Sequence, residues 1–217
     1  GADHFITLGM CEGCTDGWRF AEDEDDYPNP DFGEYTNINI YHPEWFGEID
    51  KNGNSCNKIE FKSDYRSQHS FRELISWGIK GSTGGGLSSD IDINLSWDSG
   101  KLISNSDNFQ MYIFVGDENG VNMQQQNIIS IDQSDLTLDE NNEPNIWVML
   151  GGCADSGNTE IYYQDSDGDG FGSSVEGEFC EGLQPDGWES NLNDLNDDLF
   201  CLSNNIDDCG VCDGSNV

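Results

Sequence analysis

The chain has 217 residues, of which 43 are Asp or Glu and only 8 are Lys or Arg, so its formal net charge at pH 7 is −35. This charge argues against nucleic acids and anionic membrane surfaces as direct partners, because their phosphates would be repelled. No apolar run is long enough for direct membrane insertion, and a hydrophobic content of 35% suffices for one sandwich-sized core and a smaller appendage.

Short strands separated by Gly- and Asn-containing turns are predicted over residues 1–152. The clearest is 90–98, where apolar and polar residues alternate with the period of a half-buried strand. Residues 110–115 form a continuous apolar run, as in a sandwich interior, and 81–86 read as a flexible glycine turn. Other strands or apolar runs are expected at 4–8, 37–41, 58–62, 71–80, 121–131 and 146–150, with a short helix at 70–77 as an alternative. This pattern predicts an all-β fold, a β-sandwich of the Ig-like or jelly-roll type.

A junction is expected at residues 151–157, which read Gly-Gly-Cys-Ala-Asp-Ser-Gly. It divides the chain into a β-sandwich domain (1–152) and an acidic, cysteine-containing module (153–217). No Lys or Arg follows Lys101, whereas Asp and Glu continue to the end of the chain. Because aromatic residues and cysteines also continue, we favour a small loop-rich module held by calcium and disulfides over a disordered tail.

The most specific signal is the segment 165–176, Asp-Ser-Asp-Gly-Asp-Gly-Phe-Gly-Ser-Ser-Val-Glu. Its alternate carboxylates, a glycine at the sharp turn and a returning glutamate match a calcium loop, which supplies six to eight oxygen ligands. The predicted ligands are Asp165, Asp167, Asp169, the backbone carbonyl of Phe171, and Glu176. The alternative, a solvated acidic turn, is disfavoured because clustered carboxylates repel one another without a cation.

A second stretch, Asp194, Asn196 and Asp198, repeats the alternate-oxygen spacing. It lacks a glycine at the sixth position and a carboxylate at the twelfth, so it either forms a second calcium site or completes the first. The segment 50–54, Asp-Lys-Asn-Gly-Asn, has similar alternation but one carboxylate, and a plain Asn-Gly hairpin turn is the better interpretation.

Eight cysteines without a His-rich ligand set indicate disulfides and an oxidising compartment. We expect Cys180 to pair with Cys201 and Cys209 with Cys212. A zinc site built from the Cys11/Cys14 and Cys209/Cys212 pairs is the alternative, although these pairs lie almost the whole chain apart. The predicted location is therefore extracellular, on a secreted or cell-surface protein.

The last 55 or so residues carry a family resemblance. The segments 162–172 (Tyr-Tyr-Gln-Asp-Ser-Asp-Gly-Asp-Gly-Phe-Gly), 184–188 (Gln-Pro-Asp-Gly-Trp) and 193–198 resemble calcium-binding repeats of secreted bacterial surface proteins, which are similar to thrombospondin type 3 repeats. Residues 207–216 are similar to the Cys-Gly-Val-Cys repeats of such proteins. Leu195 stands where the family usually carries a cysteine. The first half resembles Ig-like modules of large secreted bacterial proteins.

No motif of a serine hydrolase (Gly-x-Ser-x-Gly), of a zinc protease (His-Glu-x-x-His) or of a phosphate-binding loop is present, so a non-catalytic role is expected. The prediction is an extracellular, calcium-stabilised structural protein, a subunit or segment of a surface filament or adhesin. Its expected partners are other copies of itself or other surface proteins, with the run at 4–8 as a strand that could join a neighbour's sheet.

The alternative function is a carbohydrate-binding or adhesive module of a larger secreted protein, with glycans as partners. Trp18, Trp45 and Trp188 lie in loop-like sequence and are the candidate surface contacts. Trp97 and Trp147 lie in apolar patterns and are expected in the core.

Overall fold

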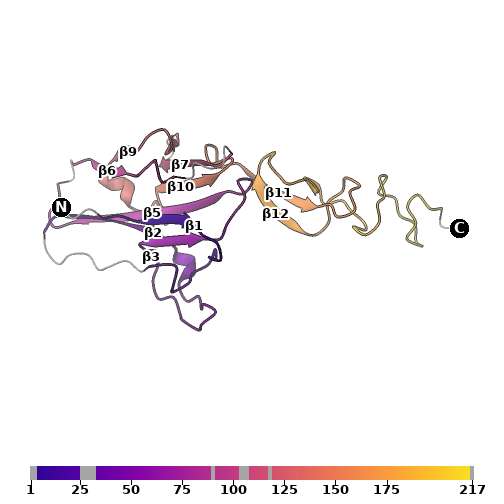
Figure 1. The fold of residues 1–217 in the computed structure, drawn as a ribbon, viewed down its shortest axis with the longest axis horizontal. Helices are drawn as coiled ribbons and strands as arrows, with labels where there is room; N and C mark the ends of the chain where they lie inside the picture. The colour runs from indigo at the N-terminus through magenta and orange to yellow at the C-terminus, as the bar shows by residue number, and fades with distance from the viewer. Residues whose placement is uncertain (1–3, 25–32, 89–90, 103–107, 117–118, 216–217) are drawn as a thin grey trace.

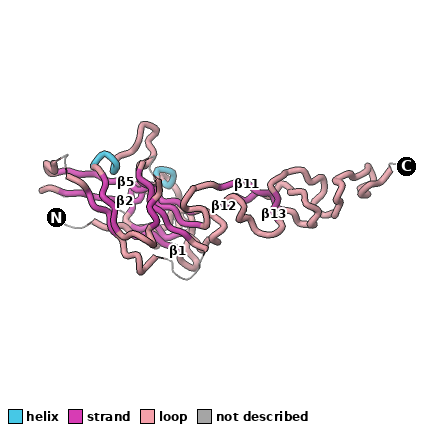
Figure 2. Tube along the Cα trace, turned by 90° about the horizontal axis from the view of Figure 1, so that it is seen from above, coloured by secondary structure: helices cyan, strands magenta, loops and turns pink. Residues whose placement is uncertain are grey.

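The computed structural model describes residues 4–24, 33–88, 91–102, 108–116 and 119–215. Its regular structure consists of strands and two short 3₁₀ helices, which confirms the prediction of an all-β protein. A strand-rich body is followed by a narrow arm that leads away from it to the C-terminus (Figures 1 and 2). The arm begins after β10 (Ile146–Gly151).

The body is built around one six-stranded sheet in which every neighbouring pair is antiparallel. Its order is β3-β2-β5-β10-β7-β8. Besides β10, its strands are β3 (Glu60–Phe61), β2 (Tyr35–Tyr41), β5 (Ile75–Gly84), β7 (Gln110–Val115) and β8 (Val121–Asn122). The 3₁₀ helices are η1 (Pro43–Trp45) and η2 (Gln133–Leu136).

The core lies on one face of this sheet because alternate side chains point to opposite faces of a strand. Trp77 of β5 and Ile146 of β10 are completely buried on that face. The antiparallel pair β6 (Ile93–Ser96) and β9 (Ile128–Ile131) adds Ile93 and Ile131 to the same hydrophobic core. Two layers of strands thus enclose the core, a sandwich-like arrangement.

A separate two-stranded sheet consists of β1 (Thr7–Met10) and β4 (Ser63–Arg66), which pair in parallel. The apolar run at 4–8 therefore begins a strand that is paired within its own chain. The strand β4 was not predicted, because its sequence Ser-Asp-Tyr-Arg shows no apolar alternation. It is nevertheless buried at Ser63 and Asp64, where Ser63 Oγ accepts the Glu24 N–H and Asp64 Oδ2 is hydrogen-bonded to His42.

Most of the predicted strands of the first half are confirmed, with shifted ends. The run at 110–115 is β7, and β6 covers the middle of 90–98, of which Asp90 lies outside the described residues. The helical alternative at 70–77 is wrong, since β5 occupies 75–84. The expected glycine turn is also wrong in part, because Gly81 lies within β5. A Cβ at Gly81 would come within 2.5 Å of the Asn37 carbonyl oxygen, so the close strand contact requires glycine.

Three tight loops share one geometry. In 50–54, 139–143 and 207–211, an aspartate begins the loop and its Oδ1 accepts the backbone N–H groups two and four residues later. The fourth residue of each loop has a positive φ: Gly53 (85°), Asn142 (66°) and Gly210 (75°). The segment 50–54 is thus the hairpin turn that its sequence favoured. Its hydrogen bonds, first of all that from the Asn54 side chain, lower the pKa of Asp50.

The arm contains a three-stranded sheet that the sequence did not predict. Its order is β12-β11-β13, with β11 (Thr159–Gln164), β12 (Glu176–Cys180) and β13 (Trp188–Glu189). Tyr162 and Phe179 are buried in it, and the Phe179 and Trp188 rings meet edge to face at 5.0 Å. From 190 to 215 the described chain consists of turns and one isolated β-bridge.

The disulfides differ from the predicted pairing. The bonds are Cys11–Cys14, Cys153–Cys180 and Cys201–Cys212. Both predicted pairs are therefore wrong, and so is the zinc alternative, because three of its four cysteines are in disulfides. The buried Cys56 and the exposed Cys209 lie outside these three bonds.

The arm is fastened to the body at the loop that precedes β5. The guanidinium of Arg72 donates to the carbonyl oxygens of Leu183 (3.1 Å) and Gln184 (2.9 Å). The backbone N–H of Cys180 donates to the Arg72 carbonyl at 2.6 Å. Since Cys180 is also bonded to Cys153, the body, the disulfide and the first arm sheet meet at one point.

Candidate metal centre

The acidic loop between β11 and β12 is shaped by its first aspartate. Asp165 Oδ1 accepts the N–H groups of Gly168 (2.7 Å) and Asp169 (3.2 Å), and Oδ2 accepts that of Gly170 (3.0 Å). Gly168 and Gly170 have φ of 81° and 91°, a conformation that residues with a Cβ rarely adopt. The glycines therefore let the chain turn tightly around one carboxylate.

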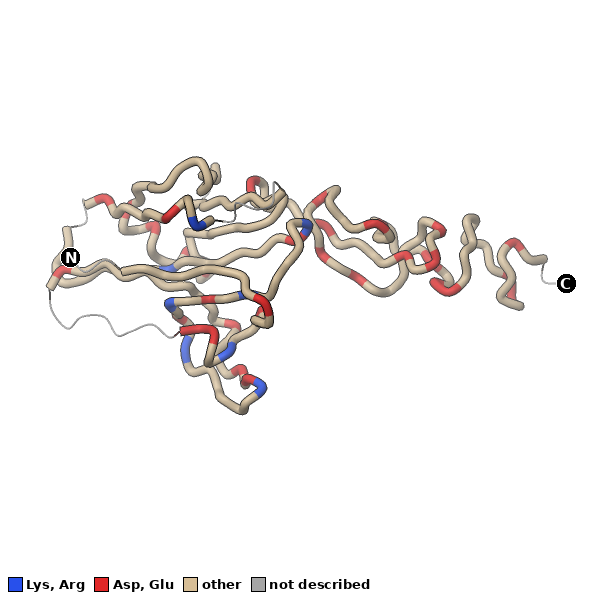
Figure 3. The backbone as a smooth tube through the Cα atoms, in the orientation of Figure 1, with Lys and Arg blue, Asp and Glu red and all other residues tan. Residues whose placement is uncertain are grey.

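The turn brings three carboxylates together. Asp165, Asp167 and Asp169 each offer an oxygen atom within 4.8 Å of the others. Asp169 is buried, and its two oxygens accept the N–H groups of Phe171 and Cys201, each at 3.0 Å. The acidic stretch of the arm is visible in Figure 3. An all-carboxylate cluster of this kind suits a hard divalent cation.

Two carboxylate oxygens at this place are buried and lack any hydrogen-bond donor, Asp167 Oδ2 and Asp194 Oδ2. Each such atom loses its hydration without compensation. Other buried side-chain atoms among the described residues also lack a partner, Asp64 Oδ1 among them, so it is the closeness of these two oxygens to the cluster that matters. Burial and the nearby charges of Asp169 and Asp194 raise the pKa of Asp167. The loop therefore has oxygen atoms that a bound cation would satisfy.

The second acidic stretch wraps around the first loop. Asn191 donates to the Gly170 carbonyl at 3.1 Å, and the Asp194 N–H donates to the Gly172 carbonyl at 3.1 Å. Asp197 accepts the backbone N–H of Ser166 at 2.8 Å and its hydroxyl at 2.7 Å. The stretch thus adds Asp194 to the surroundings of the Asp165–Asp169 cluster.

The other predicted calcium ligands are not part of the three-carboxylate cluster. Glu176 is exposed at the start of β12, opposite Tyr163 in the strand ladder, and is not one of the three clustered carboxylates. Asp198 is exposed, and the side chain of Asn196 accepts its N–H at 3.3 Å. The half-buried Phe171 follows the cluster directly. Asn191, whose side chain links the two stretches, was missed because it precedes the alternating pattern.

Two of the three tryptophans predicted to lie on the surface, Trp18 and Trp45, are buried in the body. Trp18 and Trp45 are 6% and 3% exposed and belong to the hydrophobic core, so both predictions are wrong. Trp188 is half-buried against Phe179. Trp147, which was expected in the core, is half-buried on the outer face of the sheet and lines a cleft.

A buried histidine network lies beside that cleft. His42 Nδ1 is 2.7 Å from Glu44 Oε1 and Nε2 is 3.0 Å from Asp64 Oδ2, while its ring stacks on Trp45 at 3.8 Å. Asp64 also accepts the Arg66 Nε–H at 2.8 Å. Burial by itself lowers the pKa of His42, but the hydrogen bonds with Asp64 and Glu44 outweigh it and raise the pKa above its ordinary value.

This network predicts a pH dependence of stability. Because the pKa of His42 is raised on folding, its contribution is fully present below about pH 6.5, the unfolded value, and is lost as pH rises through the folded value. The difference in unfolding free energy between the wild type and His42→Gln, measured by urea denaturation across this range, should therefore shrink with rising pH. A difference that grows with pH would contradict a charged His42.

Comparisons with known proteins found no similar protein. No protein-family model matches the chain, and neither the curated proteins nor the solved structures include a significant match. In the parts of the chain that the structure describes, no helix is long and apolar enough to span a bilayer. The three disulfides are typical of an oxidising, non-cytoplasmic environment.

Proposed function

We propose that this chain is a non-catalytic extracellular protein whose acidic arm binds Ca²⁺ and is rigidified by it, and that it serves as a structural or adhesive subunit at a cell surface. The observation that carries the proposal is the Asp165–Asp167–Asp169 cluster, together with the orphaned buried oxygens of Asp167 and Asp194. Calcium matches it better than zinc, since the ligands are oxygens and no histidine or thiolate joins them.

Calcium would stabilise the arm by linking its two acidic stretches. The arm buries few apolar side chains, and residues 190–215 contain no extended strand. Asp169 already joins the first loop to Cys201, and Asp194 approaches Asp167 from the second stretch. A cation held between these carboxylates would replace their repulsion by attraction, so metal binding is coupled to folding of the arm.

The same neutralisation would permit association. The arm carries no Lys or Arg, so arms of neighbouring copies repel one another in the absence of a counter-ion. Bound calcium lowers this charge where it is most concentrated. Self-association, or contact with other surface proteins, is then expected to depend on calcium.

A catalytic role gains no support from Ser67 and His69, a serine and a histidine that lie beside a carboxylate in the described part of the chain. Ser67 Oγ is 3.1 Å from His69 Nε2, but it is also 2.9 Å and 3.0 Å from the two oxygens of Asp16. The same His69 nitrogen faces Asp16 at 2.8 Å. A general base must be available to the nucleophile's proton, and here Asp16 occupies both groups.

The test is thermal unfolding and sedimentation of the intact, oxidised chain in millimolar calcium and in EGTA. Calcium should raise the melting temperature of the arm, with a stabilisation of about 2.7 kcal/mol at a free concentration a hundred times the dissociation constant. Sedimentation should show larger species in calcium. Magnesium at the same concentration is the control for screening, because it demands a stricter octahedral site.

The two readouts test separate parts of the proposal. An unchanged melting temperature would reject the calcium site. A raised melting temperature with a monomer at every concentration would keep the site and reject self-association as its purpose. Equal effects of magnesium and calcium would indicate charge screening in place of a specific site.

A further inference from the structure

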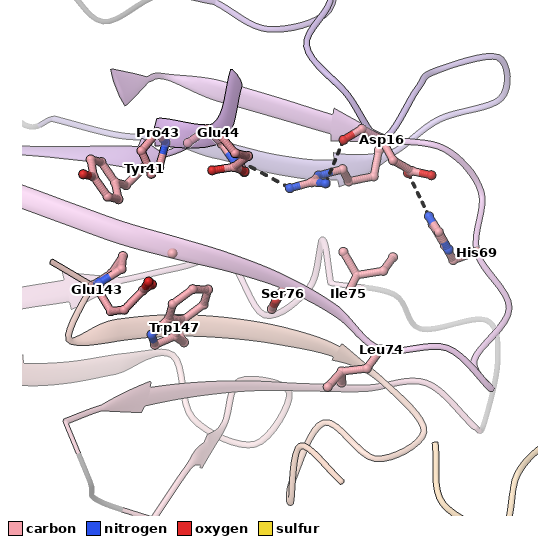
Figure 4. Close-up of a pocket in the computed structure, with 14 residues that line it drawn as sticks. Asp16, Tyr41, Pro43, Glu44, His69, Leu74, Ile75, Ser76, Glu143 and Trp147 are labelled. Atoms are coloured by element: carbon pink, nitrogen blue, oxygen red, sulfur yellow. Dashed lines mark hydrogen bonds and ion pairs between the residues drawn. The ribbon is translucent and has the colours of Figure 1, made fainter. Parts of the chain in front are cut away.

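A cleft of about 650 Å³ is lined by residues of the body alone. Tyr41, Pro43 and Glu44 line it from β2 and η1, and Ser76, Glu143 and Trp147 line it from β5 and the chain around β10 (Figure 4). Asp16 and His69 close one end. The volume falls within the range of about 300–1,000 Å³ that is usual for small-molecule sites.

The floor of the cleft is the outer face of the six-stranded sheet. Trp147 is paired with Gly78 in the β10–β5 ladder, on the face opposite to that of Trp77 and Val148. Gly78 has no side chain, and a Cβ there would come within 2.7 Å of Pro144 and 3.4 Å of Trp147. The side chains of Pro144 and Trp147 therefore pack over Gly78, and the half-buried indole of Trp147 lines the cleft, where Figure 4 draws it.

The walls carry hydrogen-bonding groups whose charges are largely balanced. Asp16 Oδ1 is 2.8 Å from His69 Nε2, and Glu44 Oε1 is 2.7 Å from His42 Nδ1. Hydrogen bonds, chiefly with His69 for Asp16 and with His42 for Glu44, outweigh the opposing effect of burial and lower the pKa of both carboxyl groups. These carboxylates stay ionised and act as hydrogen-bond acceptors at neutral pH, while Glu143, which lines the same cleft, adds another acceptor.

We propose that this cleft binds a neutral carbohydrate, with one sugar ring stacked on Trp147 and its hydroxyls donating to Glu143, Glu44 and Asp16. A pyranose presents a face of C–H groups, which packs on an aromatic ring, and a rim of hydroxyls, which donate to carboxylates. The cleft offers this combination: a half-buried indole and acceptor-rich walls. The site is separate from the calcium cluster and extends the proposed function to recognition of a glycan.

The charge distribution favours a neutral ligand. An anionic ligand would meet three carboxylates in a chain of charge −35. A cationic ligand is less well matched, since two of the three carboxylates, Asp16 and Glu44, already face His69 and His42, which leaves only Glu143 to pair with it. Arg66, which also lines the cleft, is engaged by Asp64 and by the Asp16 carbonyl. Neutral hydroxyls are the donors that fit these walls without an uncompensated charge.

The test uses the intact chain on an array of neutral oligosaccharides built from glucose, galactose, mannose and xylose, with oligolysine and sulfated oligosaccharides as charged probes. Titration calorimetry with the best neutral probe then gives affinities of variants. We expect Trp147→Ala to weaken binding about tenfold or more, because ring stacking is lost. Glu143→Ala, at an exposed position, should weaken it severalfold without affecting the fold. Phe200→Ala, an exposed aromatic change on the arm, is the matched control.

The outcomes separate the alternatives. Binding of a neutral probe that falls in Trp147→Ala and Glu143→Ala and persists in Phe200→Ala supports the proposal. Absence of any neutral ligand, or equal affinity in all three variants, overturns it. Binding of oligolysine alone that vanishes at high salt also overturns it, because that result indicates attraction by the net charge. EGTA should leave the affinity unchanged, so failure of the calcium proposal is distinguishable from failure of this one.

Discussion

Asp169→Asn is expected to weaken calcium binding at least about a hundredfold, which corresponds to about 2.7 kcal/mol. Asp169 is the buried member of the cluster. The substitution removes one negative charge from the surroundings of a divalent cation and replaces one oxygen with an amide NH₂ group. Since hard cations bind oxygen ligands and not amide nitrogens, both changes act against binding. Titration calorimetry with calcium measures the affinity directly.

The same substitution should also destabilise the calcium-free arm. The two oxygens of Asp169 accept N–H groups from Phe171 and from Cys201. An asparagine offers only one oxygen, so its NH₂ group must face one of these N–H donors, and that buried donor loses its partner. Thermal unfolding in EGTA should therefore show a lower melting temperature for Asp169→Asn than for the wild type.

Asp155→Asn provides the matched control. Asp155 is an exposed residue near the start of the arm, outside the carboxylate cluster, and the substitution changes the net charge by the same amount. It should bind calcium as the wild type does. Equal weakening in both variants would mean that calcium responds to the overall charge, and wild-type affinity in Asp169→Asn would place the ion elsewhere.

The sequence predicted those parts of the fold whose signals are local and periodic. The alternation around β6 buries Ile93 and exposes Asn94 and Ser96 as expected, although Ile91 precedes the strand and is exposed. The apolar run at 110–115 is a strand, but only Met111 and Ile113 are buried, whereas Tyr112 and Phe114 are half-buried. The strand β4 has no such pattern, because its buried positions hold Ser63 and Asp64 in a polar network. The sheet of the arm was missed because Tyr162 and Phe179 are its main buried side chains, too few for a periodic signal.

The tryptophan and cysteine errors share one physical origin. Trp45 lies in a turn-like sequence, yet the 3₁₀ helix η1 directs its ring into the core beside Phe61. Cys180 pairs with Cys153 because β12 returns alongside β11, where Thr159 stands opposite Cys180. Both outcomes depend on contacts between segments distant in the chain, and local composition does not encode these contacts.

The carboxylate cluster was predictable because its geometry is local. The three backbone hydrogen bonds that the Asp165 carboxylate accepts lie within five residues, so the spacing of three aspartates and two glycines specifies the turn around it. The contribution of Asp194 is long-range, and the sequence could only indicate that its stretch was oxygen-rich. Glu176 matched the twelfth position of the loop, but the start of β12 places it in a strand ladder.

Replacing both Cys153 and Cys180 by serine is expected to destabilise the arm by about 3.5 kcal/mol, the chain-entropy value for a closed loop of this length. The two cysteines are 27 residues apart and close the loop that contains β11, the acidic turn and β12. Both are buried, so the serines also leave polar groups where sulfur packed. Thermal unfolding of the arm in calcium, with hydrogen exchange of β11 and β12, measures the loss.

The matched control is the Cys11→Ser/Cys14→Ser pair, whose disulfide spans only three residues. The same relation gives about half the entropic effect for this bond, and the loss should appear in the body near β1. Because Cys180 also donates its N–H to the Arg72 carbonyl, the Cys153/Cys180 variant should loosen the contact between body and arm. Equal losses in the two double variants would contradict the loop-entropy argument. Unchanged exchange of β11 and β12 would show that Arg72, whose guanidinium binds the carbonyls of Leu183 and Gln184, suffices to fasten the arm.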